Sequence, residues 1–262
     1  MENAIALPNP DEKLPAILSR RRDLIEVCVG YVLILIVIWT PRPWQQYLWL
    51  LAAAGIAGMI ATSRDSLRSM GVRSKNFLRS LWVAGVALSL SAIAIAIAIR
   101  LHTLRTPGGP AEFVANFWSY TLWSGIQQFL LQGFFLLRFL RLVRNPRQAA
   151  VMAGALFALA HLPNPVLAGL TVVWGTVACL IFLRYRNLFP LAMAHAVLGI
   201  TIAVAVPGPV DHNMRVGLGY LRYHRGNIQR RVQRSQSDQI ASTVACVTAE
   251  APTRRLLLQA RP

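Results

Sequence analysis

The chain of 262 residues is 55% hydrophobic and only 14% charged, and its mean hydropathy is positive, which excludes a soluble domain of ordinary composition. The formal net charge of +17 would attract phosphate, but the basic residues are spread over predicted loops and no base-reading motif occurs, so we expect no nucleic-acid partner. Apart from Asp65 and Glu112, no acidic residue occurs between Val27 and Val206. This interval is therefore membrane-like along its whole length.

Apolar runs bounded by charge, Pro or Gly predict the membrane helices, because a bilayer core of about 30 Å needs roughly 20 apolar residues per helix. Seven such runs occur, at 24–39, 44–62, 78–99, 113–137, 147–161, 166–183 and 188–206. We therefore predict an all-α fold, a polytopic membrane bundle of about seven helices, within a range of six to eight. The first run lacks a small-residue cleavage site after it, so we interpret it as a retained anchor.

Basic residues mark alternate connections between these runs and so predict an orientation. They gather before the first run and in the segments 64–79, 138–147 and 184–186. Because basic loops stay cytoplasmic, the N-terminus is expected in the cytoplasm of what we take to be a bacterial cell. Seven spans would then send the basic C-terminal tail outside, so either the tail escapes the rule or one span is miscounted or re-entrant.

Three parts of the chain follow from this pattern. Residues 1–23 form a cytoplasmic segment, 24–206 form the transmembrane bundle, and 207–262 form a basic tail that is partly disordered or lies on the membrane surface. The basic segments make anionic lipid headgroups expected partners. The cysteines Cys28, Cys179 and Cys246 are far apart, so they indicate neither a disulfide framework nor a zinc motif.

Three glutamines, Gln127, Gln128 and Gln132, interrupt the fourth apolar run. On a regular helix they lie at about 0°, 100° and 140°, so they share one broad face. Hydrogen bonding between helices would explain one such residue, at about 0.6 kcal/mol on average and up to roughly 2 kcal/mol. For three on one face, a polar cavity is an equally good interpretation.

Two histidines fall in later runs. His161 ends the fifth run, where a capping or interface role is common, whereas His195 lies inside the seventh run without a charged neighbour. We expect both to converge with the glutamines on one pocket. The two histidines lack a third ligand, so no metal or other cofactor is expected. A serine protease with Ser124 as its nucleophile is disfavoured, because the Gly that precedes such a serine by two residues is missing.

These helices resemble the CAAX-protease and bacteriocin-processing family of intramembrane endopeptidases over roughly residues 113–206. The family motifs are Glu-Glu-x-x-x-Arg, Phe-x-x-x-His and His-x-x-x-Asn. They correspond here, in order, to Gln127-Gln128-Phe-Leu-Leu-Gln132, Phe157-Ala-Leu-Ala-His161 and His195-Ala-Val-Leu-Gly199. The resemblance implies a multi-span helical fold and a catalytic site at Gln127, Gln128, Gln132, His161 and His195.

The chain departs from the family at its acids. The resemblance implies that the first Glu activates water and that the last His and Asn stabilise the oxyanion; an amide at Gln127 cannot take a proton, and Gly199 replaces the Asn. Glu112 lies about 15 residues, or roughly 22 Å of helix, from Gln127, and Asp65 is predicted in a loop.

Two functions therefore stay open. One, which the resemblance implies, is a membrane endopeptidase that cleaves a membrane-associated or prenylated peptide, weakly with His161 as its base. The other is a catalytically silent relative that binds or scaffolds a membrane peptide or protein. A transporter or channel would lack an obvious coupling site.

Overall fold

The computed structural model describes residues 10–63, 65–105, 108–223, 225–226, 228–229, 233, 236–237, 239 and 241, with side chains from residue 19 onward. The chain divides into two units, Met1–Gly219 and Tyr220–Pro262, and the first carries every helix discussed below. The predicted tail falls largely on residues outside the described ones, as do residues 1–9 of the predicted cytoplasmic segment. The prediction of a disordered or membrane-surface tail therefore stays a prediction.

The described residues of the first unit form helices and no strand. In chain order they are α1 (Pro10–Trp39), α2 (Arg42–Ala61), α3 (Phe77–Ser80), α4 (Trp82–Arg100), α5 (Pro110–Gln128), the π-helix η1 (Phe129–Leu136), α6 (Leu137–Leu142), α7 (Pro146–Leu159), α8 (Pro165–Tyr185), α9 (Phe189–Ala205), α10 (Gly208–Asp211) and the short 3₁₀ helix η2 (His212–Met214). All seven predicted runs are helical, so the predicted fold class, an all-α membrane helix bundle, is confirmed.

Local signals explain where several helices begin. Proline occupies the first turn of α2, α5, α7, α8 and α9, where its missing N–H has no helical partner to lose. Two asparagines cap helices with their side chains: Asn145 accepts from the N–H of Arg147, and Asn164 accepts from the N–H of Leu167. The turn before α8 is therefore held in a defined geometry, which matters because His161 lies in it.

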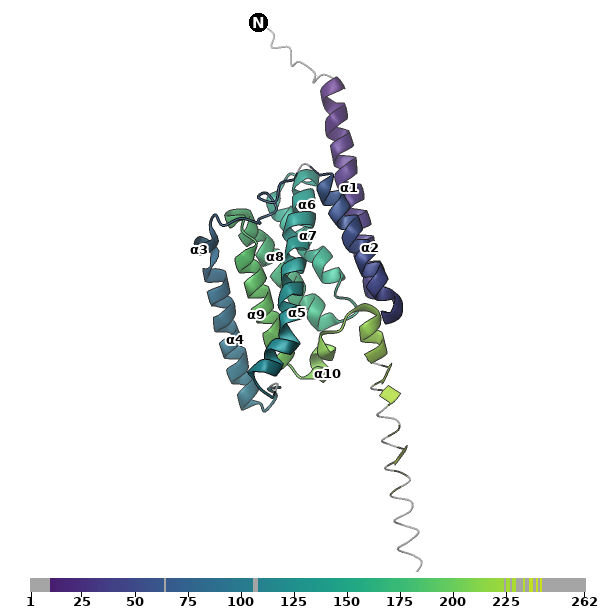
Figure 1. Ribbon diagram of the computed structural model, residues 1–262, viewed down its shortest axis with the longest axis vertical. Helices are drawn as coiled ribbons and strands as arrows, with labels where there is room; N and C mark the ends of the chain where they lie inside the picture. The colour runs from purple at the N-terminus through teal and green to yellow at the C-terminus, as the bar shows by residue number, and fades with distance from the viewer. Residues whose placement is uncertain are drawn as a thin grey trace, which may run out of the picture. The chain divides into compact units, whose positions relative to one another are not determined.

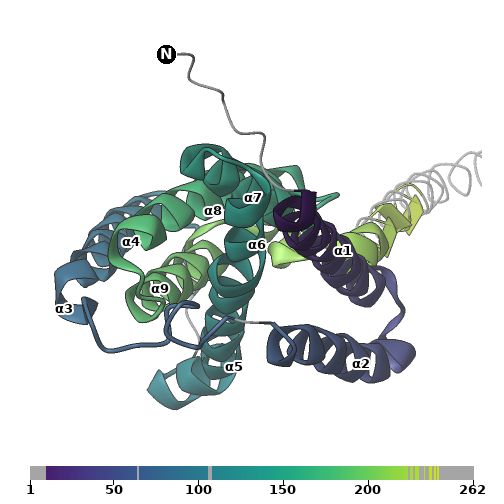
Figure 2. The same cartoon turned by 90° about the horizontal axis from the view of Figure 1, so that it is seen from above.

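The helices pack side by side, as Figures 1 and 2 show. In both views α1 and α2 lie on one side and α4 on the other. The main packing pairs are α7 with α8, α4 with α9 and α5 with α9, while α1 contacts α2 and α6. Many large side chains, including Trp44, Leu78 and Trp118, are exposed around the bundle. Such an outer surface suits helices that face lipid.

The number of membrane spans stays a prediction. By length and hydropathy, two helical stretches of the described chain can cross a membrane, Phe77–Arg100 and Pro165–Tyr185. The bent pair Phe189–Ala205 and Gly208–Met214, which turns by 120°, would be a third. Helix α7 has only 14 residues, so it is short for a bilayer core that needs roughly 20.

Small residues bring α7 and α8 close together. A Cβ at Gly154 would overlap the hydroxyl of Thr176 and stand 2.7 Å from its backbone nitrogen. A Cβ at Gly175 would stand 3.1 Å from a ring carbon of Phe157. Only glycine permits this approach, as is common at helix contacts in membranes. The crossing sets Phe157 of α7 against Gly175 of α8, the residue after Trp174, and the rings of Phe157 and Trp174 both lie near His195.

Candidate functional site

A chain of hydrogen bonds joins Gln132, Gln128 and His195. Gln132 Nε2 donates to Gln128 Oε1 at 2.6 Å, and Gln128 Nε2 lies 2.9 Å from His195 Nδ1. Both glutamine side chains are fully buried, and His195 is 7% exposed. The predicted convergence of a glutamine with an intramembrane histidine therefore exists in the structure, between the end of α5 and the middle of α9.

The donor and acceptor roles in this series of hydrogen bonds determine which ring nitrogen of His195 carries the proton. An amide nitrogen can only donate, so His195 Nδ1 accepts from Gln128 and the neutral ring carries its proton on Nε2. His195 thus offers an N–H donor at its other edge. Gln132 Oε1, at the other end of these hydrogen bonds, is buried without a hydrogen-bond partner. The set is neutral throughout, because it contains two amides and one imidazole.

His161 lies in the turn after α7, where its Nδ1 is 2.7 Å from the carbonyl oxygen of Phe157. A carbonyl only accepts, so Nδ1 carries the proton and Nε2 keeps its lone pair. This bond is the capping role expected of a histidine at a helix end. The turn is anchored on both sides: Gly217 donates its N–H to the Leu162 carbonyl, and Asn164 Nδ2 donates to the Asp211 carbonyl.

An aromatic ring separates the two histidines. The ring of Phe157 lies 4.8 Å from the His161 ring and 5.9 Å from the His195 ring, each in an edge-to-face arrangement. The ring of Trp174 lies 6.1 Å from that of His195. His161 and His195 therefore belong to one aromatic cluster without contacting each other through a hydrogen bond. The cluster therefore places the N–H donor of His195 and the acceptor nitrogen of His161 among apolar rings.

Gln127 does not join the hydrogen-bonded chain. It is half-buried and makes no side-chain hydrogen bond to Gln128 or Gln132, although regular helical geometry predicts one broad face for all three. Gln127 and Gln128 are consecutive residues of α5, so their side chains diverge by about 100°, and Gln128 is the one that contacts Gln132. The helix then changes from α to π at Phe129. A π segment adds a residue to the turn, and such segments are frequent at functional sites.

Tyr120 fills the space beside Gly199, the position of the family's oxyanion-binding Asn. A Cβ on Gly199 would overlap the Tyr120 hydroxyl and stand 2.5 Å from the ring carbon Cζ. The phenol of α5 thus covers the face of α9 one turn beyond His195. Ser124 is no nucleophile candidate in this geometry, because it is fully buried and its hydroxyl donates to the Tyr120 carbonyl at 2.9 Å.

The acids of the predicted loops lie elsewhere. Glu112 accepts from the N–H of Gly108 at 2.7 Å, at the start of α5. Asp65 pairs with Arg141 at 2.8 Å and lies 3.9 Å from Arg138. Within the described residues, neither carboxylate contacts a residue of the glutamine and histidine cluster. The site therefore holds no group that matches a carboxylate base.

Sequence reasoning missed a buried ion network at the junction of α1 and α6. Arg138 is fully buried, its guanidinium lies 2.6 Å from Glu26, and it covers the Phe134 ring at 3.7 Å. Arg141 donates to both oxygens of Asp23 at 2.8 to 3.0 Å. The signal was present, because Glu26 falls within the first predicted run and is an acid where lipid was expected.

Comparison with known families identifies the segment that carries these residues. Residues 110–201 match the family model described as type II CAAX prenyl endopeptidase Rce1-like. The matched segment runs from α5 into α9 and includes all five predicted site residues. No curated protein and no solved structure matches the chain. The resemblance that the motifs predict is confirmed, with bounds close to the predicted core of 113–206.

Proposed function

We propose that this CAAX-protease-like membrane protein binds a hydrophobic peptide without cleaving it. The premise is that residues 110–201 belong to the type II CAAX prenyl endopeptidase Rce1-like family. The ligand would be a membrane-associated or prenylated segment of another protein. The observation that carries the proposal is the neutral chain from Gln132 through Gln128 to His195. Hydrolysis of an amide needs a base to activate water, and an amide side chain cannot serve as one.

The geometry supports peptide binding in two ways. His195 presents an N–H donor and His161 an acceptor nitrogen, which are the two partners that a peptide group requires. The rings of Phe157 and Trp174 beside them suit an apolar side chain or an isoprenoid. The hydrogen bond from Gln128 holds His195 in its donor form, so Gln128 acts as a positioning residue.

Slow proteolysis is the second candidate, and one observation favours it. His161 carries its proton on Nδ1 through the bond to the Phe157 carbonyl, which leaves the Nε2 lone pair able to accept a proton from water. His195 Nε2–H would then stabilise the developing oxyanion. In this mechanism the His161 nitrogen takes one proton from water as the oxygen attacks the peptide carbonyl, and returns it to the leaving amine.

Binding and cleavage are separated by one experiment on the full-length protein in liposomes. A fluorescent farnesylated peptide reports binding by anisotropy and hydrolysis by chromatography. We expect saturable binding by the wild type without cleavage, and binding about three- to tenfold weaker in His195→Asn, because one hydrogen bond is lost. His102→Asn is the matched control, because His102 is exposed in the connection between α4 and α5.

The outcomes are distinct. Cleavage by the wild type that His161→Asn abolishes would replace the silent protein with the slow protease. Cleavage gained only by Gln127→Glu would support a retained fold whose base is missing. Equal binding by the wild type, His195→Asn and His102→Asn would refute the binding proposal, because the proposed contact would then carry no affinity.

A further inference from the structure

Two connections far apart in the sequence are joined into one platform at one end of the bundle. The segment 71–76 precedes α3, and the segment 185–188 joins α8 to α9. Asn187 Nδ2 donates to the carbonyls of Arg73 and Lys75 at 2.7 and 3.0 Å, and Asn76 Nδ2 donates to the Tyr185 carbonyl at 3.0 Å. Asn187 is buried. The positions of the side chains on this platform are therefore fixed by backbone contacts rather than by loose loops.

The platform holds two arginines close together. Arg73 Nη2 donates to the carbonyl of Tyr185, the residue that precedes Arg186, while Arg73 Nε is buried without a hydrogen-bond partner. The Arg186 guanidinium lies 5.7 Å from the centre of the Phe182 ring. Burial and the neighbouring charge of Arg73 together lower the pKa of Arg186. The two cations therefore lie near enough for their charges to interact, and Arg73 keeps one N–H without a partner.

No carboxylate compensates these charges within the described part of the chain. The ion pairs among the described residues lie elsewhere; Arg138, for example, pairs with Glu26, and Arg141 pairs with Asp23. Neither Arg73 nor Arg186 forms a salt bridge to any described residue. Arg73 and Arg186 are half-buried and, among the described residues, lack the carboxylate partner that Arg138 has. This pair is therefore left for a ligand of opposite charge, since like charges at short range are costly without one.

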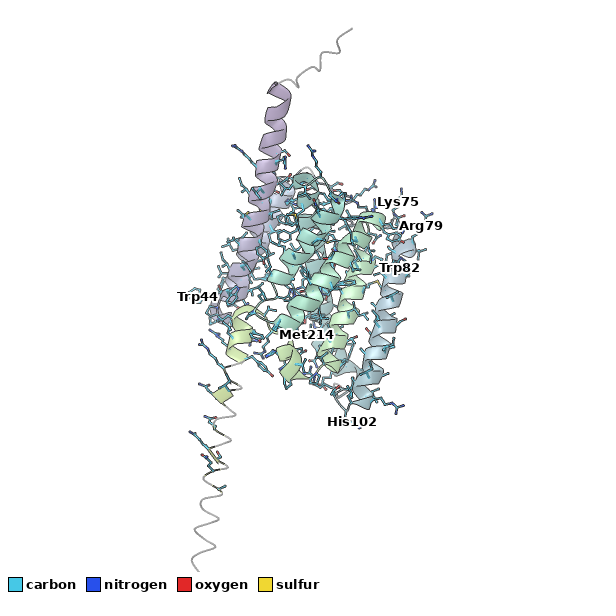
Figure 3. The ribbon with its side chains drawn as sticks, turned by 180° about the vertical axis from the view of Figure 1, so that it is seen from behind. Trp44, Lys75, Arg79, Trp82, His102 and Met214 are labelled. Carbon is cyan, nitrogen blue, oxygen red and sulfur yellow. The ribbon has the colours of Figure 1, made fainter. Side chains whose placement is uncertain are left out.

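The surroundings are those of a membrane interface. Figure 3 shows Lys75 and Arg79 at the same end of the bundle, with Trp82 just below them. Trp82 Nε1 donates to the Tyr185 hydroxyl at 3.3 Å, so two aromatic residues with polar tips lie against the platform. Helix α9 begins at Phe189, and its positive end adds to the field. Apolar helices continue from there along the bundle, as the chains of a bound lipid require.

We propose that Arg73 and Arg186 bind one phosphate-type anion, supplied in the membrane by the headgroup of an anionic phospholipid. A phosphodiester offers two oxygens to a pair of guanidinium groups, which are the donors best matched to phosphate. The predicted orientation places this platform on the cytoplasmic side, where the negative leaflet attracts basic segments. This site is separate from the glutamine and histidine cluster and does not depend on the proposed peptide binding.

The test measures thermal unfolding of the full-length protein in a neutral detergent, alone and with added phosphatidylglycerol, phosphatidylcholine or inorganic phosphate. We expect phosphatidylglycerol to raise the unfolding temperature of the wild type by mass action, with phosphatidylcholine giving no comparable shift. In Arg186→Gln the half-saturating fraction of phosphatidylglycerol should rise at least about tenfold, because charge-assisted hydrogen bonds are lost. Arg79→Gln is the matched control, since Arg79 is an exposed cation at the same end.

The direction in which Arg186→Gln changes the unfolding temperature distinguishes a ligand site from a structural role, because it should differ without and with anionic lipid. Without anionic lipid, Arg186→Gln should unfold at a higher temperature than the wild type, because one of two repelling cations is gone. A full phosphatidylglycerol response in Arg186→Gln, or an equal loss in Arg79→Gln, would overturn the proposal in favour of diffuse attraction. If inorganic phosphate reproduces the shift and Arg186→Gln abolishes it, the anion site stands and its ligand is free phosphate. Arg73→Lys serves as a second variant, which keeps the charge and removes the planar fork.

Discussion

The contact between Tyr120 and Gly199 gives the sharpest prediction about the candidate site. Gly199→Ala adds one methyl group to the face of α9 that the Tyr120 phenol covers. That methyl would overlap the hydroxyl and stand 2.5 Å from Cζ and 2.7 Å from Cε1 of the ring. The ring must therefore move or the two helices must separate. Gly125→Ala on α5 is the matched control, because no atom lies within 4 Å of its added Cβ.

The expected magnitude follows from two opposing effects. Replacing Gly by Ala in a helix interior gains up to about 1 kcal/mol. Overpacking a well-filled contact costs about 1 to 3 kcal/mol. Gly125→Ala should show only the gain, whereas Gly199→Ala should show both effects. The difference in unfolding free energy between the two variants is therefore about 1 to 3 kcal/mol, with Gly199→Ala the less stable.

Equilibrium unfolding in mixed detergent micelles measures this difference, and Tyr120→Ala tests its cause. The double variant Tyr120→Ala, Gly199→Ala should recover about 1 kcal/mol relative to the sum of the two single changes, because the overlap no longer exists. Equal stability of Gly199→Ala and Gly125→Ala would refute the reasoning. So would strict additivity in the double variant, since the damage would then not arise at the phenol.

Three further changes test the buried polar groups by the same unfolding assay. Glu26→Gln should destabilise the protein by about 3 kcal/mol, because Arg138 is left buried with Asp65 only at 3.9 Å, and an unchanged stability would contradict a buried pair. Gln128→Leu should cost about 1 to 3 kcal/mol by leaving its partners unsatisfied, whereas Gln127→Leu should be nearly neutral. Gln132→Arg alone should lower the unfolding free energy by about 3 kcal/mol. Adding Gln128→Glu should recover most of this loss through an ion pair between residues four apart, and no recovery would contradict the observed contact.

The sequence predicts the helices well because each helix that crosses a lipid bilayer needs a long run of apolar residues. The predicted run 188–206 corresponds to α9 at Phe189–Ala205, and 166–183 corresponds to α8 at Pro165–Tyr185. Proline and asparagine at the helix starts sharpen these bounds. The run 113–137 is less complete, because the structure continues through η1 into α6 and ends at Leu142. Periodicity alone carries no signal for a π-helix, so the change from α to π at Phe129 could not be predicted.

The ion network shows what sequence spacing cannot supply. Arg138 and Glu26 are 112 residues apart, and the charges of α6 fit the positive-inside pattern so well that no partner is needed to explain them. For the site itself, the motif order correctly groups Gln128 with His195. It does not reveal that Phe157 separates the two histidines or that Tyr120 occupies the space beside Gly199. These are packing facts, which depend on helix crossings rather than on local pattern.

The buried arginine also bears on why the site is neutral. One explanation for glutamines at the family's acidic and basic positions is that this chain avoids burying ions. Arg138 and Glu26 argue against it, because the same chain buries a paired guanidinium completely. Gln128 and Gln132 make an equally short contact at 2.6 Å, so the backbone there could hold an ion pair of the same kind. The neutrality is thus local to the cluster around His195. A site whose function is to hold a peptide group benefits from fixed, uncharged donors, because a carboxylate there would retain water and add a base.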